Sequence, residues 1–195
     1  MTTFLLILST VFLLISPIAY AISIIRGRSR PHRLTRLSLM AAMLLSFVSA
    51  LDADANPGTL ILTGIFAVQS VVIFGMTLWR GMGGQSLFDW SCFVLSIVGL
   101  AAWQLSGNAL VGIWFAIFAD TAAYIPAFVK TWKHPHTEGH WFYTLGIIGT
   151  LFGLFAYPLS PASAFQVYVV AASLVMLFCI FRPGIFTKVA AGPVV

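Results

Sequence analysis

The stretch AYIPAFVKTWKHPH (Ala123–His136) repeats the pattern of AYAISIIRGRSRPH (Ala19–His32) at an offset of 104 positions. Each stretch starts at the end of an apolar run, passes through a basic residue and ends in Pro-His. Further identities at the same offset are Pro57 and Pro161, Ala67 and Ala171, Val71 and Val175, and Phe74 and Phe178. A register shared by helix ends and loops over about 60 positions indicates an internal repeat.

The composition around this repeat excludes a water-soluble domain. Hydrophobic residues make up 60% of the 195 positions and charged residues only 8%, whereas soluble domains carry about 25% charged residues. A helix needs about 20 apolar residues to cross a bilayer, so seven spans use about 140 residues and leave only short connections. The chain is therefore predicted to be an all-α integral membrane protein whose function is carried by its helix bundle.

Seven apolar runs are separated by breakers rich in Gly, Pro and Asn. The predicted transmembrane helices are 4–25, 37–51, 59–79, 88–105, 109–129, 141–157 and 162–181. The last is expected to end at Pro183-Gly184, because proline lacks the N–H that continues a helix. The first ends in Ala19-Tyr20-Ala21, which resembles a signal-peptidase site, but no positive charge precedes it, so this span is expected to be retained.

The basic residues predict the orientation of the chain. All ten Lys and Arg residues lie in or beside the first, third and fifth loops and the C-terminal tail. Because cytoplasmic loops carry an excess of basic residues, the N-terminus is predicted outside and the C-terminus in the cytoplasm. We therefore interpret the basic residues as orientation signals, and we do not expect a nucleic-acid-binding surface.

The repeat predicts the domain organisation. Residues 1–80 form a first triple-helix bundle, 81–107 a linker helix, 108–184 a second triple-helix bundle and 185–195 a short cytoplasmic tail. With three spans per copy, direct fusion would invert the second copy, so the linker helix is needed to keep the two bundles parallel.

Residues Tyr124–Gly139, YIPAFVKTWKHPHTEG, resemble the conserved segment of the PQ-loop and SWEET transporter superfamily. In that family a Pro-Gln pair on the first helix of each bundle precedes a basic residue and a short polar loop. Pro126 matches the family proline, Ala127 stands where the glutamine would be, and Ile22-Ser23 replaces the pair in the first copy. With its three-plus-one-plus-three layout, the resemblance covers nearly the whole chain. Because bacterial nicotinamide-riboside-type transporters share that layout, it implies a carrier in a bacterial inner membrane.

An acidic residue inside an apolar run is the main candidate for function. Asp120 lies eleven residues after Ala109, near the bilayer centre, where a carboxylate costs about 2.5–3.5 kcal/mol. We predict that it binds a polar or cationic substrate or carries a proton, with a neutral hydrogen bond between helices as the alternative. No basic residue is expected at its depth. Gln69 and its repeat partner Ser173 are predicted to contact substrate, or only to join helices.

Two pairs of residues are candidates for gating. Tyr20 and Tyr124 are related by the repeat and would face one another across its axis, as an inner gate or as contacts to substrate, unless they only anchor the helices at the interface. Pro126 is a candidate hinge, as in the resembling family, and Pro17 a second one, although a proline near a helix end is often only tolerated.

Metal and cofactor chemistry have little support in the sequence. His134, His136, His140 and Glu138 lie within seven residues, but their spacing favours a solvated loop near the lipid headgroups over a metal site. Cys92 and Cys179 lie in separate apolar runs and are predicted to be packing residues. We expect no metal, no cofactor and no enzymatic activity, because no nucleophile and base converge in the predicted spans.

These patterns predict a transporter of a small polar metabolite, working by alternating access between the two bundles. Coupling to protons through Asp120 is left open, because a carboxyl that alternates between neutral and ionised states can link proton movement to substrate. The alternative is a non-transporting scaffold or a receptor or sensor, for which a closed, fully packed centre would be the discriminating observation. The expected partners are the lipid bilayer and a small-molecule substrate, and association of copies stays open.

Overall fold

The computed structural model describes residues 2–52, 57–83, 86–107, 109–156 and 164–190. This described part is all-helical. Its elements are α1 (Thr2–Ile25), α2 (Arg33–Asp52), α3 (Pro57–Arg80), α4 (Leu87–Leu105), α5 (Ala109–Lys133), the 3-10 turn η1 (Pro135–Thr137), α6 (His140–Ala156) and α7 (Ala164–Ala190). The predicted all-helical class with seven helices is confirmed, because each predicted apolar run coincides with one helix.

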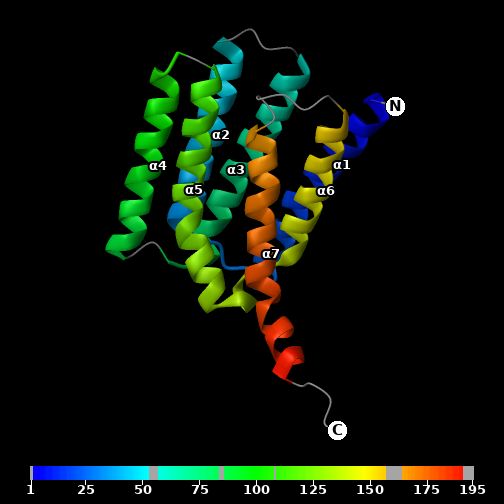
Figure 1. The fold of residues 1–195 in the computed structure, drawn as a ribbon, viewed down its shortest axis with the longest axis vertical. Helices are drawn as coiled ribbons and strands as arrows, with labels where there is room; N and C mark the ends of the chain where they lie inside the picture. Colours follow the sequence, from blue (N-terminus) through cyan, green and yellow to red (C-terminus); the bar gives the residue numbers. More distant parts are fainter. Residues whose placement is uncertain (1, 53–56, 84–85, 108, 157–163, 191–195) are drawn as a thin grey trace.

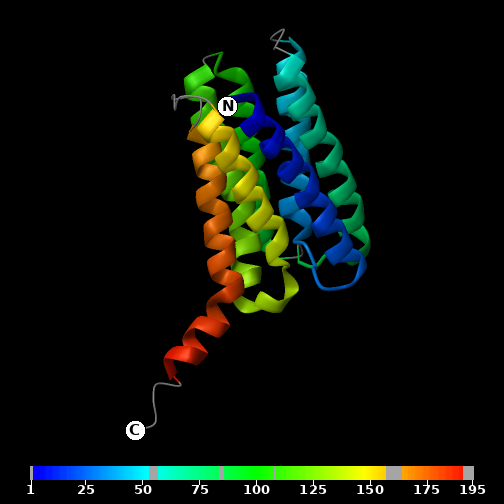
Figure 2. The same cartoon turned by 90° about the vertical axis from the view of Figure 1, so that its right-hand side faces the viewer.

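The C-terminal end of α7 differs from the prediction. The helix continues through Pro183 and Gly184 to Ala190, so the end predicted at Pro183-Gly184 is wrong. A proline inside a helix removes one backbone hydrogen bond and commonly bends the helix without ending it. Figure 2 shows the C-terminal part of α7 turned away from the other helices.

Six helices form a closed ring. Helix α1 packs against α3 and α6, α2 packs against α3 and α5, and α7 packs against α5 and α6. Helix α4 lies outside this ring, against α5 and α2, at one edge of the molecule in Figure 1. Exchanging α1 with α5, α2 with α6 and α3 with α7 turns each of these helix–helix contacts into another contact of the same ring. Helix α1 begins at one end of the ring, and α7 ends beyond the other (Figure 1).

Many apolar side chains of the helices are exposed on the surface of the molecule. Two described segments, Thr2–Ile25 and Ala164–Arg182, are long and apolar enough to cross a membrane by length and composition. Shorter apolar helical segments are Gly64–Arg80, Leu87–Ala102 and His140–Ala156. Large apolar side chains are exposed on α1, α3, α4, α5, α6 and α7, examples being Phe4, Val68, Leu87, Trp114, Phe155 and Leu174.

Glycines allow α1 and α6 to approach closely. A Cβ added at Gly149 would lie 2.9 Å from Leu13 Cγ and 3.1 Å from Phe12 Cβ. The Ser16 hydroxyl donates a hydrogen bond to the Phe142 carbonyl oxygen across the same contact, at 2.7 Å. Small residues let helix backbones approach in this way where packing drives association. The α1–α6 contact therefore depends on the absence of a side chain at position 149.

The substitution Gly149→Val is expected to destabilise the protein by about 1–3 kcal/mol, because the added methyl groups overpack the contact with α1. Thermal unfolding of the purified protein in detergent measures the loss. Gly75→Val is the matched control, since an added Cβ at Gly75 meets nothing within 4 Å. Equal losses in the two variants would contradict the close α1–α6 packing.

Candidate functional site

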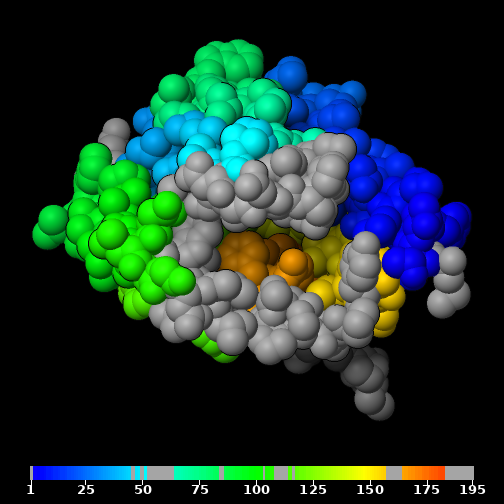
Figure 3. Space-filling model, turned by 90° about the horizontal axis from the view of Figure 1, so that it is seen from above, coloured from blue at the N-terminus to red at the C-terminus, as the bar shows by residue number. Residues whose placement is uncertain are grey.

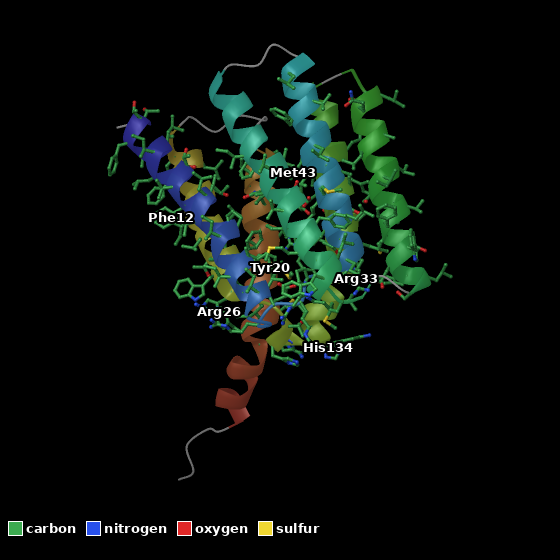
Figure 4. All side chains as sticks on the ribbon, turned by 180° about the vertical axis from the view of Figure 1, so that it is seen from behind. Phe12, Tyr20, Arg26, Arg33, Met43 and His134 are labelled. Carbon is green, nitrogen blue, oxygen red and sulfur yellow. The ribbon has the colours of Figure 1, made fainter. Side chains whose placement is uncertain are left out.

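The three described connections 26–32, 81–83 and 134–139 lie at one end of the ring, which we call the basic end. Figure 4 places Arg26, Arg33 and His134 toward this end, and Phe12 and Met43 nearer the other. Backbone hydrogen bonds join the connections: Arg30 N–H donates to Thr137 O at 2.7 Å, and Met82 N–H donates to Pro31 O at 2.9 Å. The basic end is therefore tied together by main-chain contacts between segments far apart in the sequence.

A buried ion pair lies just inside the basic end. The carboxylate of Glu138 pairs with the ammonium of Lys130, and its Oε2 accepts a hydrogen bond from the Tyr20 hydroxyl at 2.9 Å. The Lys130 ammonium also donates to the Arg30 carbonyl oxygen at 2.7 Å. We call Tyr20, Lys130 and Glu138 the Glu138 cluster. It joins α1 to α5 and to the segment before α6, and all three side chains are buried.

Arg36 lies beside this cluster in the interior of the ring. Its side chain is 8% exposed, and its guanidinium carbon lies 4.6 Å from the centre of the Tyr20 ring and 5.2 Å from that of Phe142. These distances fit cation–π contacts. Tyr124 and Tyr143 are also within its electrostatic reach. Arg36 and Lys130 are both buried, Arg36 against aromatic rings and Lys130 against a carboxylate. Their interpretation as orientation signals stays a prediction.

Asp120 is buried between α2, α4 and α5. It lines a gap of about 150 Å³, too narrow for a water molecule, together with Ser38 and Ser96. The Ser96 hydroxyl donates to Ser38 Oγ at 2.9 Å. The Tyr168 hydroxyl lies beside the Asp120 carboxyl without a hydrogen bond of normal geometry, and Arg36 attracts the carboxylate. No described cation forms an ion pair with Asp120, so the expectation that no basic residue lies at its depth stays a prediction.

The repeat-related tyrosines lie in two neighbouring clusters of side chains. Tyr20 is buried with Ile24 and Ile73, and its ring centre lies 4.6 Å from that of Phe142. Tyr124 is half-buried and packs against the cluster that contains Tyr143, which Phe142 also contacts. Phe142 therefore connects the two clusters, and both tyrosines act on Arg36 electrostatically. A gating role for either tyrosine stays a prediction.

The remaining candidates are Gln69, Pro17, Ser173 and Pro126. The Gln69 side-chain oxygen is buried without a hydrogen-bond partner in the described part, and Gln69 and Pro17 line an apolar groove of about 470 Å³ between α1 and α3. Ser173 is half-buried on α7. Helices α1 and α5 run on past Pro17 and Pro126, and Pro126 is buried. Their roles as substrate contacts and hinges stay predictions.

The histidine-rich loop is partly buried, unlike the solvated loop expected from the sequence. His134 and His136 are exposed, whereas Glu138 turns inward to Lys130. His140 starts α6, and its ring centre lies 4.9 Å from that of Trp141. The sequence analysis weighed Glu138 only as a metal ligand and did not predict its buried ion pair with Lys130. A lone acid in a basic loop is the signal that could have indicated the pair.

A second buried contact ties α2 to α4 and α5. His32 Nε2 lies 3.4 Å from Asp89 Oδ1, and His32 Nδ1 lies 3.1 Å from the Thr35 hydroxyl. That hydroxyl donates to the Ala123 carbonyl oxygen at 2.7 Å. Burial lowers the pKa of His32, although Asp89 opposes the shift. This histidine therefore favours its neutral form and acts as a structural contact.

Comparison with known proteins matches the chain to no family model, no curated protein and no solved structure.

Proposed function

We propose that the chain is a multi-pass membrane carrier that moves a small polar metabolite by alternating access between α1–α3 and α5–α7. The observation that carries the proposal is the difference between the two ends of the ring. Inter-loop hydrogen bonds and the Glu138 cluster close the basic end. Seen from the opposite end, the ring has a hollow at its centre, with side chains of α6 and α7 visible below the surface (Figure 3).

The outer surface supports placement of the ring in a bilayer. Tryptophans at both ends are exposed, including Trp79, Trp114 and Trp141, as are many aliphatic side chains between them. Water-soluble monomers rarely expose continuous apolar surface on this scale. The basic end carries the Lys and Arg residues, so it faces the cytoplasm under the positive-inside rule. The hollow then faces outward.

The contacts between the two groups of helices define what has to break for the basic end to open. Lys130 and Glu138 both belong to the α5–α7 half, so their ion pair can persist. The contacts that cross between the halves near this end include the Tyr20–Glu138 hydrogen bond and the stacking of Arg36 on Phe142. Further crossing hydrogen bonds join Lys130 to Arg30 O, Arg30 N–H to Thr137 O, Gly139 N–H to Ser29 Oγ and the Thr35 hydroxyl to Ala123 O. These contacts have to break or re-form together when the basic end opens in an alternating-access cycle.

Flux through proteoliposomes tests the proposal. Purified protein is reconstituted and tested with labelled sugars, nucleosides, vitamin precursors and amino acids, with protein-free liposomes as the control. We expect saturable flux of at least one class. An imposed pH gradient in the same assay tests proton coupling through Asp120. If protons and substrate move together from the acidic side, the substrate is expected to accumulate on the alkaline side. Absence of both binding and flux across the panel would favour a scaffold or receptor.

A further inference from the structure

A groove of about 470 Å³ lies between α1 and α3 and has an apolar surface. On α1 its wall extends from Leu14 to Ala21, and on α3 from Gly64 to Ile73. Gln69 is the one polar residue among the described residues that line it, and the oxygen of this side chain is buried. The groove therefore offers van der Waals contacts along its length and suits a hydrocarbon chain better than a polar solute.

The groove opens on the apolar outer surface of the ring. Leu14 and Ile18, in its α1 wall, belong to a row of exposed apolar side chains whose spacing places them on one face of the helix. The other members of this row are Ile7, Val11 and Ile25. In the α3 wall, Val68 is 66% exposed and Val72 is 53% exposed. In a bilayer these side chains contact lipid.

Three exposed arginines lie where the two helices of the groove reach the basic end. Arg26 and Arg28 flank Gly27 in the connection after α1, and Arg80 is the last residue of α3; Figure 4 shows Arg26 at this end of α1. A Cβ added at Gly27 would lie 3.1 Å from Arg80 Nη1, so the Arg80 guanidinium reaches from α3 to this connection. Neither of the two ion pairs of the described part includes any of these arginines. Positive charges gathered in this way attract an anion.

The spacing between the groove and the arginines matches the depth of one membrane leaflet. At about 1.5 Å of rise per residue, the groove begins about 8–11 Å from Arg26 and Arg80 along their helices and ends about 18–24 Å from them. The headgroup region of a bilayer is about 5–8 Å deep, and half of the hydrocarbon core is about 15 Å thick. An acyl chain whose headgroup lies at the arginines would therefore enter the groove below the headgroup and end near the bilayer centre.

We propose that the groove binds one acyl chain of an anionic phospholipid whose phosphate is held by Arg26, Arg28 and Arg80. This inference rests on the membrane placement in the proposed function and goes beyond it by assigning a lipid site. A guanidinium matches two phosphate oxygens in a bidentate contact, and the cytoplasmic leaflet supplies anionic lipids. A second copy packed on the groove in the same orientation would bring the two basic ends together, and this repulsion favours lipid as the occupant.

Lipid binding by the full chain in detergent tests the proposal. The protein is titrated with dioleoyl phosphatidylglycerol, which is anionic, and with dioleoyl phosphatidylcholine, which carries the same acyl chains on a zwitterionic headgroup. Native mass spectrometry counts the bound lipid. Phosphatidylglycerol is expected to bind about tenfold more tightly, because its phosphate makes charge-assisted hydrogen bonds without a neighbouring cation. Inorganic phosphate at the same concentration should not displace it, since that ion cannot fill the groove. Equal affinities for the two lipids, or displacement by inorganic phosphate, would overturn the proposal.

Variants separate the headgroup contact from the chain contact. Arg80→Gln is expected to weaken phosphatidylglycerol binding about fivefold and to leave phosphatidylcholine binding unchanged. Lys133→Gln is the matched control, since Lys133 is exposed at the same end but belongs to α5. Val68→Trp fills the groove and is expected to weaken both lipids about tenfold, whereas Val71→Trp, at an exposed position outside the groove, should bind like the wild type. Unchanged phosphatidylglycerol affinity in either Arg80→Gln or Val68→Trp would overturn the proposal.

The outcomes separate this inference from the carrier proposal. Saturable solute flux, with no preference for phosphatidylglycerol, would overturn the lipid site and leave the carrier function intact. Lipid binding with the predicted variant pattern, but without flux of any solute in proteoliposomes, would support the site and overturn transport. A dimer in the mass spectrum that Val68→Trp abolishes, with no bound phosphatidylglycerol, would identify a second copy as the occupant and overturn the proposal.

Discussion

A disulfide between positions 23 and 139 is expected to reduce flux to the level of protein-free liposomes. Ser23 lies near the end of α1, and Gly139 directly precedes α6 at the basic end. A Cβ added at Gly139 would lie 3.6 Å from Ser23 Cβ, within the range of about 3.5–4.5 Å that disulfides need. The double variant Ser23→Cys with Gly139→Cys would therefore fasten the two halves at the end that has to open.

The measurement compares flux under oxidising conditions with flux after reduction, in a background where the free thiols Cys92 and Cys179 are replaced by alanine. The matched control is Ser9→Cys with Gly153→Cys, which joins the same two helices toward the other end, where the added Cβ lies 3.9 Å from Ser9 Cβ. Because that contact lies away from the end that has to open, oxidation should leave flux intact. Undiminished flux through the oxidised 23–139 variant would contradict closure at the basic end.

The substitution Glu138→Gln is expected to lower the free energy of unfolding by about 3–5 kcal/mol, because removing one partner of a buried ion pair leaves the other charge uncompensated. The Glu138 side chain is 1% exposed and that of Lys130 is 5% exposed, so water does not replace the lost partner. Equilibrium unfolding in detergent, followed by tryptophan fluorescence, measures the change.

Two further variants test the cause of that loss. Asp89→Asn keeps a side-chain oxygen that can accept a hydrogen bond from neutral His32, and is expected to cost no more than about 1 kcal/mol. Combining Glu138→Gln with Lys130→Met removes both charges and should recover most of the stability, because no unpaired charge stays buried. A double variant as unstable as Glu138→Gln alone would contradict the assigned role of the ion pair.

The helices could be predicted because their signal is local. Each consists of an apolar run of sufficient length bounded by Gly, Pro or polar residues, and this information lies within the segment itself. The end of α7 was missed because whether a proline ends a helix or bends it depends on how neighbouring residues satisfy the freed carbonyl, which Pro183 alone does not reveal. Asp120 stood out because an acid within an apolar run is rare.

The polar interior could not be predicted in the same way. Arg36, Lys130 and Glu138 lie at the margins of apolar runs, where charged residues are ordinary, and only contacts from distant segments bury them. Tyr20 and Glu138 are 118 positions apart, and Lys130 and Arg30 are 100 apart. The repeat was also misleading here, since Arg26, the counterpart of Lys130, is exposed. Burial of a long cationic side chain depends on the partners that the fold supplies.

The long separation between Tyr20 and Glu138 has a consequence for biogenesis. Ribosomes add about 5–20 residues per second, so about 6–24 s pass between synthesis of the two partners. During that interval α2 has left the ribosome with Arg36, while Phe142 and the other covering residues of α5 and α6 do not yet exist. If the chain spans a bilayer as proposed, a guanidinium covered by Tyr20 alone is costly inside the hydrocarbon. The nascent α2 is then expected to keep Arg36 close to the headgroups. On that proposal, α2 would settle to its final depth only after α5 and α6 have been inserted.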